Sequence, residues 1–171
     1  MESLRNPVSI VRLPSSFSGR DRRISSGEEK VLLEGCFEYG GEIHDVVVLA
    51  IETAMRRWEI VSLKWENVDL GKRTARLIDT KNGESRTVPL SRVAVSVLHI
   101  RKKTPRIDGR VIGMTPEAIT GAFERVCHRV GIEDLRFHDL RHEATSTKGT
   151  TGGSTVSRNG WKKLLSHSMS F

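Results

Sequence analysis

Residues 74–90 read TARLIDTKNGESRTVPL, and this stretch decides the fold class. Two short β-prone runs, Thr74 to Asp79 and Ser85 to Leu90, lie on either side of the pair Asn82-Gly83. An Asn-Gly pair between two such runs is a strong hairpin signal, because both residues tolerate the positive φ angles of a tight turn. The sequence therefore predicts one antiparallel hairpin, with Lys81 immediately before its turn.

Helical patterns occupy the sequence on both sides of this hairpin. Apolar residues recur at helical spacing, and Ser, Thr, Pro and Gly stand where helices begin and end. The first helix is expected to bury Val31, Leu32 and Leu33. The pattern predicts helices at residues 25–40, 42–55, 58–64, 91–102, 115–130 and 137–146. The expected fold is mainly α with a small antiparallel β-sheet, an α+β class.

The charge balance favours a polyanionic partner. The chain has 171 residues, a net charge of +7 and a sequence pI near 9.8. Binding a phosphate backbone releases condensed counterions, so a basic protein gains affinity for nucleic acid. Charge alone also fits a basic protein that binds nothing, so the motifs must decide.

Cysteine usage and hydropathy indicate a cytoplasmic location. Cys36 and Cys127 lie in apolar surroundings, far apart and outside any CxxC spacing, so we expect two small core residues rather than zinc ligands. No apolar stretch approaches the length of a membrane span, and the N-terminus has no signal-peptide core.

Composition divides the chain into three parts. Residues 1–24 are basic and broken by Pro7 and Pro14, as in an arm or linker that follows a missing upstream domain. Residues 25–146 carry the helices and the hairpin. Residues 147–171 begin with a Gly/Ser/Thr-rich run and lack helical periodicity, so we expect a divergent, disordered or frameshifted tail.

Cationic side chains stand at three points of the middle part. Arg56 lies at the junction of two expected helices, and Lys81 lies beside the hairpin turn. His138 and Arg141 are three residues apart, so they share one face of a helix. Each could be a solvated surface residue when taken alone. They matter together, because guanidinium groups match phosphate oxygens with parallel hydrogen bonds and the His138–Arg141 face could offer a guanidinium and an imidazole to the same phosphate.

A zinc hydrolase is the remote alternative. His138 and His142 are four residues apart, as in the HExxH pattern, but Asp139 stands where that pattern needs Glu. Arg141 would place a positive charge beside the metal, and no third ligand is evident. We therefore expect neither a metal nor a cofactor.

Three sequence boxes resemble the tyrosine recombinase (phage integrase) family. They are the run from Thr53 to Trp65 around Arg56, the run from Asp79 to Leu90 around Lys81, and His138-Asp139-Leu140-Arg141-His142. The likeness covers roughly residues 6 to 146 and implies a metal-free DNA strand transferase. It implies that Arg56 and Arg141 clamp the scissile phosphate, that Lys81 protonates the leaving oxygen and that His138 assists. Glu59 matches a position that supports Arg56.

The sequence also departs from the family pattern. A tyrosine attacks the phosphate in this family, but Tyr39 precedes the first box and the chain ends at Phe171. His167 occupies a setting similar to the family's next histidine, and Trp58 replaces a small residue and is expected to crowd the site. We expect a C-terminally truncated member of the family, inactive alone, whose partners are double-stranded DNA and other recombinase protomers. The alternative is a non-catalytic DNA-binding module or a partner of an intact recombinase.

Overall fold

The computed structural model describes residues 22–78 and 85–141. Its secondary structure confirms the predicted class, mainly helical with a small antiparallel sheet. In chain order the elements are α1 (Ser26–Tyr39), α2 (Ile43–Thr53), α3 (Arg57–Ser62), η2 (Trp65–Asn67), β1 (Val68–Asp69), β2 (Thr74–Ile78), β3 (Ser85–Pro89), α4 (Arg92–Lys102), α5 (Pro116–Val130) and η3 (Phe137–Asp139).

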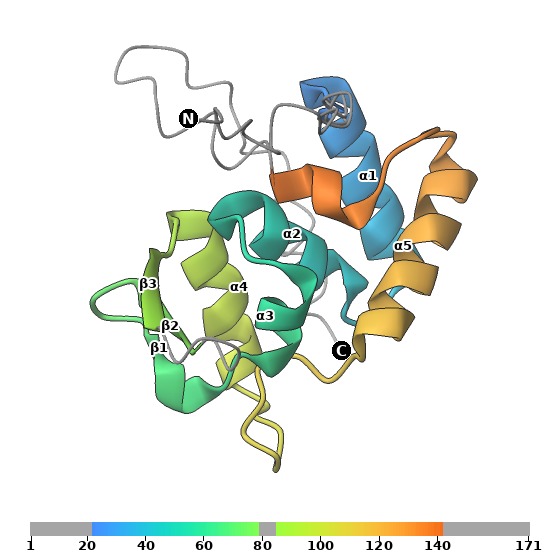
Figure 1. Ribbon diagram of the computed structural model, residues 1–171. Coiled ribbons are helices and arrows are strands. Elements are labelled where there is room, and N and C mark those ends of the chain that lie inside the picture. The colour runs from blue at the N-terminus through green and yellow to red at the C-terminus, as the bar shows by residue number, and fades with distance from the viewer. Residues whose placement is uncertain (1–21, 79–84, 142–171) are drawn as a thin grey trace, which may run out of the picture.

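Helix α2 is the centre of the fold. It contacts α1, α3, α4 and α5, while the sheet lies to one side of the helices (Figure 1). A helix surrounded in this way must be apolar on nearly every face. The buried residues of α2 meet that requirement: Ile43, Val46, Val47, Val48, Leu49, Ala50, Ile51 and Thr53.

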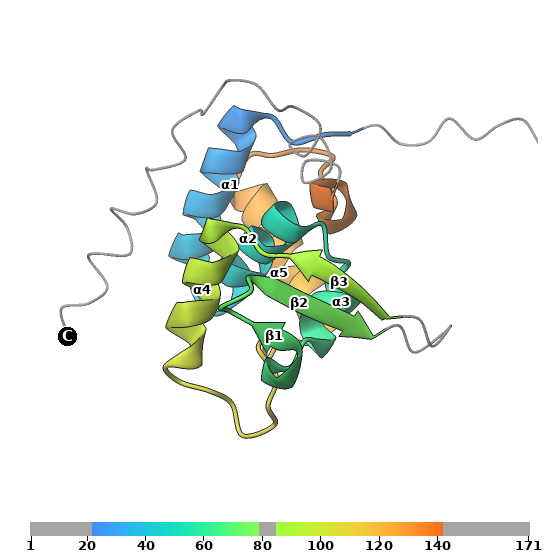
Figure 2. The same cartoon turned by 90° about the vertical axis from the view of Figure 1, so that its left-hand side faces the viewer.

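The sheet contains the predicted hairpin and one further short strand. Strands β2 and β3 pair antiparallel, with Leu77 opposite Arg86 and Ile78 opposite Ser85 (Figure 2). The turn residues, Lys81 included, lie outside the described residues. Strand β1 pairs with β2 on its other edge, and the sequence analysis missed it because two residues are too few to reveal alternation.

Helix termini carry the residue types expected at helix ends. Ser25 caps α1 and forms a capping box with Glu28, while Thr115 caps α5 and Gly131 ends it with a φ of 71°. Helices α2 and α3 are shorter than predicted. Within residues 22–78 and 85–141, no helix has both the length and the hydropathy to cross a membrane.

Two expectations about the helices need correction: the face that α1 buries and the type of helix that begins at Phe137. Val31 is 41% exposed, because α1 buries Leu32 and Cys36 against α2 and α5 and turns Val31 outward. The segment expected as a helix from Phe137 begins as the 3-10 turn η3, and helical backbone follows at Leu140 and Arg141. The rest of that segment lies outside the described residues.

Both cysteines are buried, as predicted. Cys36 on α1 and Cys127 on α5 belong to the hydrophobic core, and both are free thiols. Burial raises the pKa of Cys36 to about 12 and that of Cys127 to about 11. Because the thiolate is the reactive form, burial disfavours nucleophilic reactions of both side chains.

Replacing Glu28 by Gln should weaken the fold in a pH-dependent way. Hydrogen bonds from Arg22, then from the backbone of Ser25, lower the Glu28 pKa to about 2. This stabilisation is therefore complete above the unfolded pKa of about 4.3 and is lost as the pH falls towards 2. We expect Glu28→Gln to lower the free energy of unfolding by about 1 kcal/mol at pH 7 and by almost nothing near pH 2. The value at pH 7 allows for the partial exposure of the Arg22–Glu28 pair, which water screens.

Urea unfolding at several pH values measures this difference. The matched control is Glu34→Gln on the same helix, because the Lys30–Glu34 pair is well exposed and should contribute little at any pH. If the stability lost in Glu28→Gln did not change with pH, the loss would not come from the ion pair with Arg22.

Candidate anion-binding site

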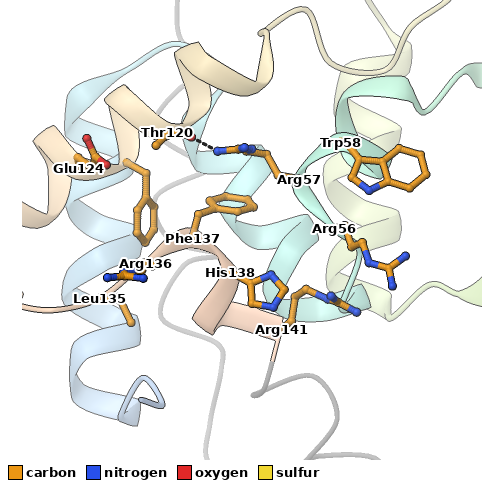
Figure 3. Close-up of a pocket in the computed structure, with 11 residues that line it drawn as sticks. Arg56, Arg57, Trp58, Thr120, Glu124, Leu135, Arg136, Phe137, His138 and Arg141 are labelled. Carbon is orange, nitrogen blue, oxygen red and sulfur yellow. Dashed lines mark hydrogen bonds between the residues drawn. The ribbon is translucent and has the colours of Figure 1, made fainter. Parts of the chain in front are cut away.

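A cation-lined pocket lies between the start of α3, α5 and η3 (Figure 3). Its volume is about 420 Å³. The described residues that line it include four arginines and a histidine against a single carboxylate, that of Glu124. The full lining is Arg56, Arg57, Trp58, Thr120, Phe123, Glu124, Leu135, Arg136, Phe137, His138 and Arg141.

Arg56 reaches the pocket because the chain turns sharply after α2. Ala54 ends α2 in the left-handed conformation with a φ of 56°, and Arg56 then adopts an extended backbone as the N-cap of α3. The Arg56 backbone N–H donates to the Glu59 carboxylate at 2.5 Å. The Arg56 side chain is 47% exposed, so its guanidinium remains available to a ligand.

Glu59 is a buried carboxylate shared by two arginines. Its side chain is only 3% exposed. Arg86 Nη2 on β3 donates to both Glu59 oxygens at 2.9 and 2.8 Å, and Arg56 Nη1 lies 3.6 Å from Oε1. Burial of a carboxylate requires this kind of compensation. The predicted support of Arg56 by Glu59 is therefore present as direct contacts, and Arg86 joins it.

Arg141 is tied to the turn that precedes Arg56. Its Nε donates to the Ala54 carbonyl oxygen at 3.0 Å. Burial lowers the pKa of Arg141, and the neighbouring Arg56 charge adds to this effect. Arginine remains protonated despite such a shift, so the pocket holds two adjacent positive charges whose repulsion a bound anion would relieve.

His138 shares the pocket with Arg141, while the aspartate between them does not. His138 is exposed, and the close-up shows its ring beside Arg141 (Figure 3). Asp139 is 4% exposed and accepts a hydrogen bond from the Arg136 backbone N–H at 2.9 Å, so it caps η3. This structural role differs from that of the acid in a zinc-hydrolase motif.

The structure thus brings together three of the five predicted site residues. Arg56, His138 and Arg141 line one pocket, and Lys81 and His167 lie outside the described residues. His142, the second histidine of the zinc alternative, also lies outside them. Among residues 22–78 and 85–141 there is no group of three potential metal ligands.

Sequence reasoning missed several residues of the site. Arg57 donates a hydrogen bond to Thr120 on α5, and Arg136 lines the same end of the pocket. Arg86 stands within the quoted hairpin box but received no role. Arg57 follows Arg56 directly and Arg136 lies two residues before His138, so the sequence already placed both near predicted site residues, whereas Arg86 comes near the pocket only through the tertiary fold.

The arrangement can bind an oxyanion. Guanidinium groups from separate elements converge on one space, and each can donate parallel hydrogen bonds to phosphate oxygens. Because these donors are fixed by Glu59 and Ala54 before any ligand arrives, they can stabilise charge that accumulates on such oxygens during a reaction.

Comparison with known proteins agrees with this description. Residues 37–148 match the model of the phage integrase family. A shufflon-specific DNA recombinase of Escherichia coli is 45% identical over 141 residues, which are 82% of this chain and 36% of that protein. The chain spans between about a third and a half of the length of the curated relatives it matches.

Solved structures share the fold. The crystal structure of XerA recombinase superposes with a TM-score of 0.64 at 20% identity, over 88% of this chain and 56% of that one. A lambda integrase tetramer bound to a Holliday junction gives a TM-score of 0.59 at 15% identity, over 73% of this chain and 41% of that one. The fold is that of tyrosine recombinase catalytic domains. The chain belongs to the phage integrase family.

Proposed function

We propose that the pocket binds a backbone phosphate of double-stranded DNA as part of site-specific recombination. Arg56 and Arg141 clamp the phosphate oxygens, and His138 hydrogen-bonds beside them. The observation that carries the proposal is the hydrogen bond from Arg141 to the Ala54 carbonyl, which holds the two arginine boxes together at one pocket. Where a tyrosine from outside these 171 residues attacks the phosphorus, Lys81 protonates the 5′ oxygen that leaves as its P–O bond breaks, and His167 contributes a further hydrogen bond to the phosphate.

We assign the role of nucleophile to none of these residues. Tyr39 is the only tyrosine among the 171 residues. Its hydroxyl accepts a hydrogen bond from Arg125 Nε at 2.9 Å, and Tyr39 is not among the pocket-lining residues. We therefore propose that these 171 residues bind DNA without forming a phosphotyrosyl bond.

The domain assignment and the partners follow from the same proposal. Residues 25–146 form the DNA-binding, catalytic-like unit and 147–171 a divergent tail, while the arm expected at residues 1–24 joins the folded unit at its end, since Ile24 lies in the hydrophobic core and Arg22 bonds to Glu28. Other recombinase protomers are the proposed protein partners, supported by the lambda integrase tetramer on a Holliday junction. The bacterial origin of a 45%-identical relative supports a cytoplasmic site of action, where bacterial DNA resides.

A suicide DNA substrate tests the proposed lack of cleavage. Such a substrate traps a covalent protein–DNA adduct once a strand is cut. We expect retarded DNA on a native gel and no adduct after denaturation. A trapped adduct would overturn the proposed lack of cleavage, and its loss in Tyr39→Phe would identify Tyr39 as the nucleophile.

Arg141→Ala should weaken DNA binding at every salt concentration. A lost phosphate contact releases fewer counterions, so we expect the slope of log K against log salt to fall by about 1. Arg56→Ala should behave in the same way. Fluorescence anisotropy with a labelled duplex measures both the affinity and the slope.

Lys30→Ala is the matched control for charge. Lys30 is an exposed cation on α1 outside the pocket. Lys30→Ala removes one positive charge, as Arg141→Ala does, and should change the salt slope far less. Equal slopes for Arg141→Ala and Lys30→Ala would mean that the protein binds DNA through its net charge and not through this pocket.

A further inference from the structure

Trp58 has a large aromatic side chain that does not pack in the hydrophobic core. Its residue is 37% exposed and belongs to neither the core nor the partly buried residues packed against it. It lies in the first turn of α3, where Ile60 and Val61 supply the buried apolar contacts. Packing within the described residues therefore gives no reason for an indole at this position.

The same side chain forms part of the wall of the anion-binding pocket. Figure 3 shows Trp58 on the same side of the pocket as Arg56, away from Glu124 at the other end. Trp58 was expected to crowd the site, yet a pocket of about 420 Å³ remains with the indole on its lining. Trp58 thus presents an apolar ring next to cations without filling the space between them.

A nucleotide has the complementary chemistry. Each backbone phosphate is joined to a deoxyribose with apolar C–H faces, and each base has a π face. An aromatic ring beside a phosphate clamp can cover the sugar, or stack on a base where the strand is unstacked, and it loses little conformational freedom because it has two χ angles. Free phosphate offers no surface for such a contact.

We propose that Trp58 contacts the nucleotide next to the phosphate held by Arg56 and Arg141, and so contributes affinity that does not depend on charge. This inference rests on the proposed function of the pocket. It extends that function from phosphate binding to recognition of the adjoining sugar and base. Trp58 is a binding residue in this account and takes no part in proton transfer.

The contact has two measurable consequences. Intrinsic fluorescence of Trp58 should change on titration with a short mixed-sequence DNA duplex, in a full chain that carries Trp65→Phe and Trp161→Phe. Trp58→Ala should weaken duplex binding about ten-fold. Its salt slope should stay at the wild-type value, because the indole releases no counterions. Trp58→Phe should recover most of the affinity.

Phe37→Ala is the matched control. Phe37 is 39% exposed on α1 and does not line the pocket, so its loss should leave DNA binding unchanged. Circular dichroism and urea unfolding should show that Trp58→Ala, Trp58→Phe and Phe37→Ala fold, as expected for substitutions of exposed side chains, and should establish the stability of the Trp65→Phe background, because Trp65 packs against the core.

The outcomes of these measurements distinguish a failure of the Trp58 contact from a failure of the proposed phosphate binding. If the wild-type chain binds duplex DNA with a salt slope that falls in Arg141→Ala, the pocket function holds. Unchanged affinity in Trp58→Ala together with unchanged Trp58 fluorescence would then overturn the Trp58 contact alone. If the wild-type chain binds no DNA at all, both proposals fail together.

Discussion

Phe123→Ala is expected to lower the free energy of unfolding by about 3–5 kcal/mol. Phe123 is 1% exposed and is among the largest fully buried side chains of the described residues. Its ring packs edge-to-face against Phe137, with centroids 5.5 Å apart, and such pairs add to the stabilisation from burial. Truncation removes that contact and leaves a cavity between α5 and η3. Urea unfolding followed by circular dichroism measures the loss.

The same substitution should also disturb the pocket. Phe137 directly precedes His138, and Arg141 follows one turn later. A cavity beneath Phe137 loosens the segment that carries both, so we expect weaker DNA binding in Phe123→Ala even where the chain is folded. Phe123→Leu should cost less in both measurements, and Phe37→Ala at the surface should cost little. A loss below about 1 kcal/mol in Phe123→Ala would show that α5 and η3 do not depend on this contact.

The elements predicted correctly are those specified by a few neighbouring residues. The β2–β3 hairpin follows from two β-prone runs around an Asn-Gly pair, and the ends of α1 and α5 follow from Ser25, Thr115 and Gly131. These signals act within a turn or two of the chain. Val31 shows their limit, since the choice of which residue an apolar run buries depends on the partners of the helix.

Interactions between distant residues were not predictable in this way. Arg101 on α4 contacts Glu42 and Asp45 across more than fifty residues and donates from Nε to the Val111 carbonyl oxygen at 2.8 Å. Its side chain is only 15% exposed. Charged pairs of this kind leave no periodicity in the sequence, because each partner alone reads as a surface residue.

The candidate site combines both situations. Each arginine box was visible because its residues are contiguous, and the family resemblance supplied their expected convergence. The hydrogen bond that joins Arg141 to Ala54 spans 87 residues and could be seen only in the fold. Arg86 was overlooked for the same reason, since its partner Glu59 lies 27 residues earlier.

Glu59→Ala is expected to destabilise the fold by about 2 kcal/mol. Removal of one partner from a fully buried ion pair costs about 3–5 kcal/mol, but Arg56 and Arg86 are each about half exposed and water can partly solvate them. The variant also loses the acceptor for the Arg56 backbone N–H. The positive charges of Arg56 and Arg86 then remain without their shared carboxylate, and that of Arg141 lies near them. Glu59→Gln should lose less, because its amide oxygen can still accept from the Arg56 backbone.

A double-mutant cycle with Arg86→Ala isolates the charge interaction. If Arg86 stabilises the protein through Glu59, the double variant should lose less than the sum of the two single variants, with a coupling of about 1 kcal/mol. Urea unfolding of the four proteins gives this coupling directly. Strictly additive losses would mean that the hydrogen bonds from Arg86 contribute nothing net. The carboxylate would then act on the pocket through the backbone and side chain of Arg56, and DNA binding should survive Arg86→Ala unchanged.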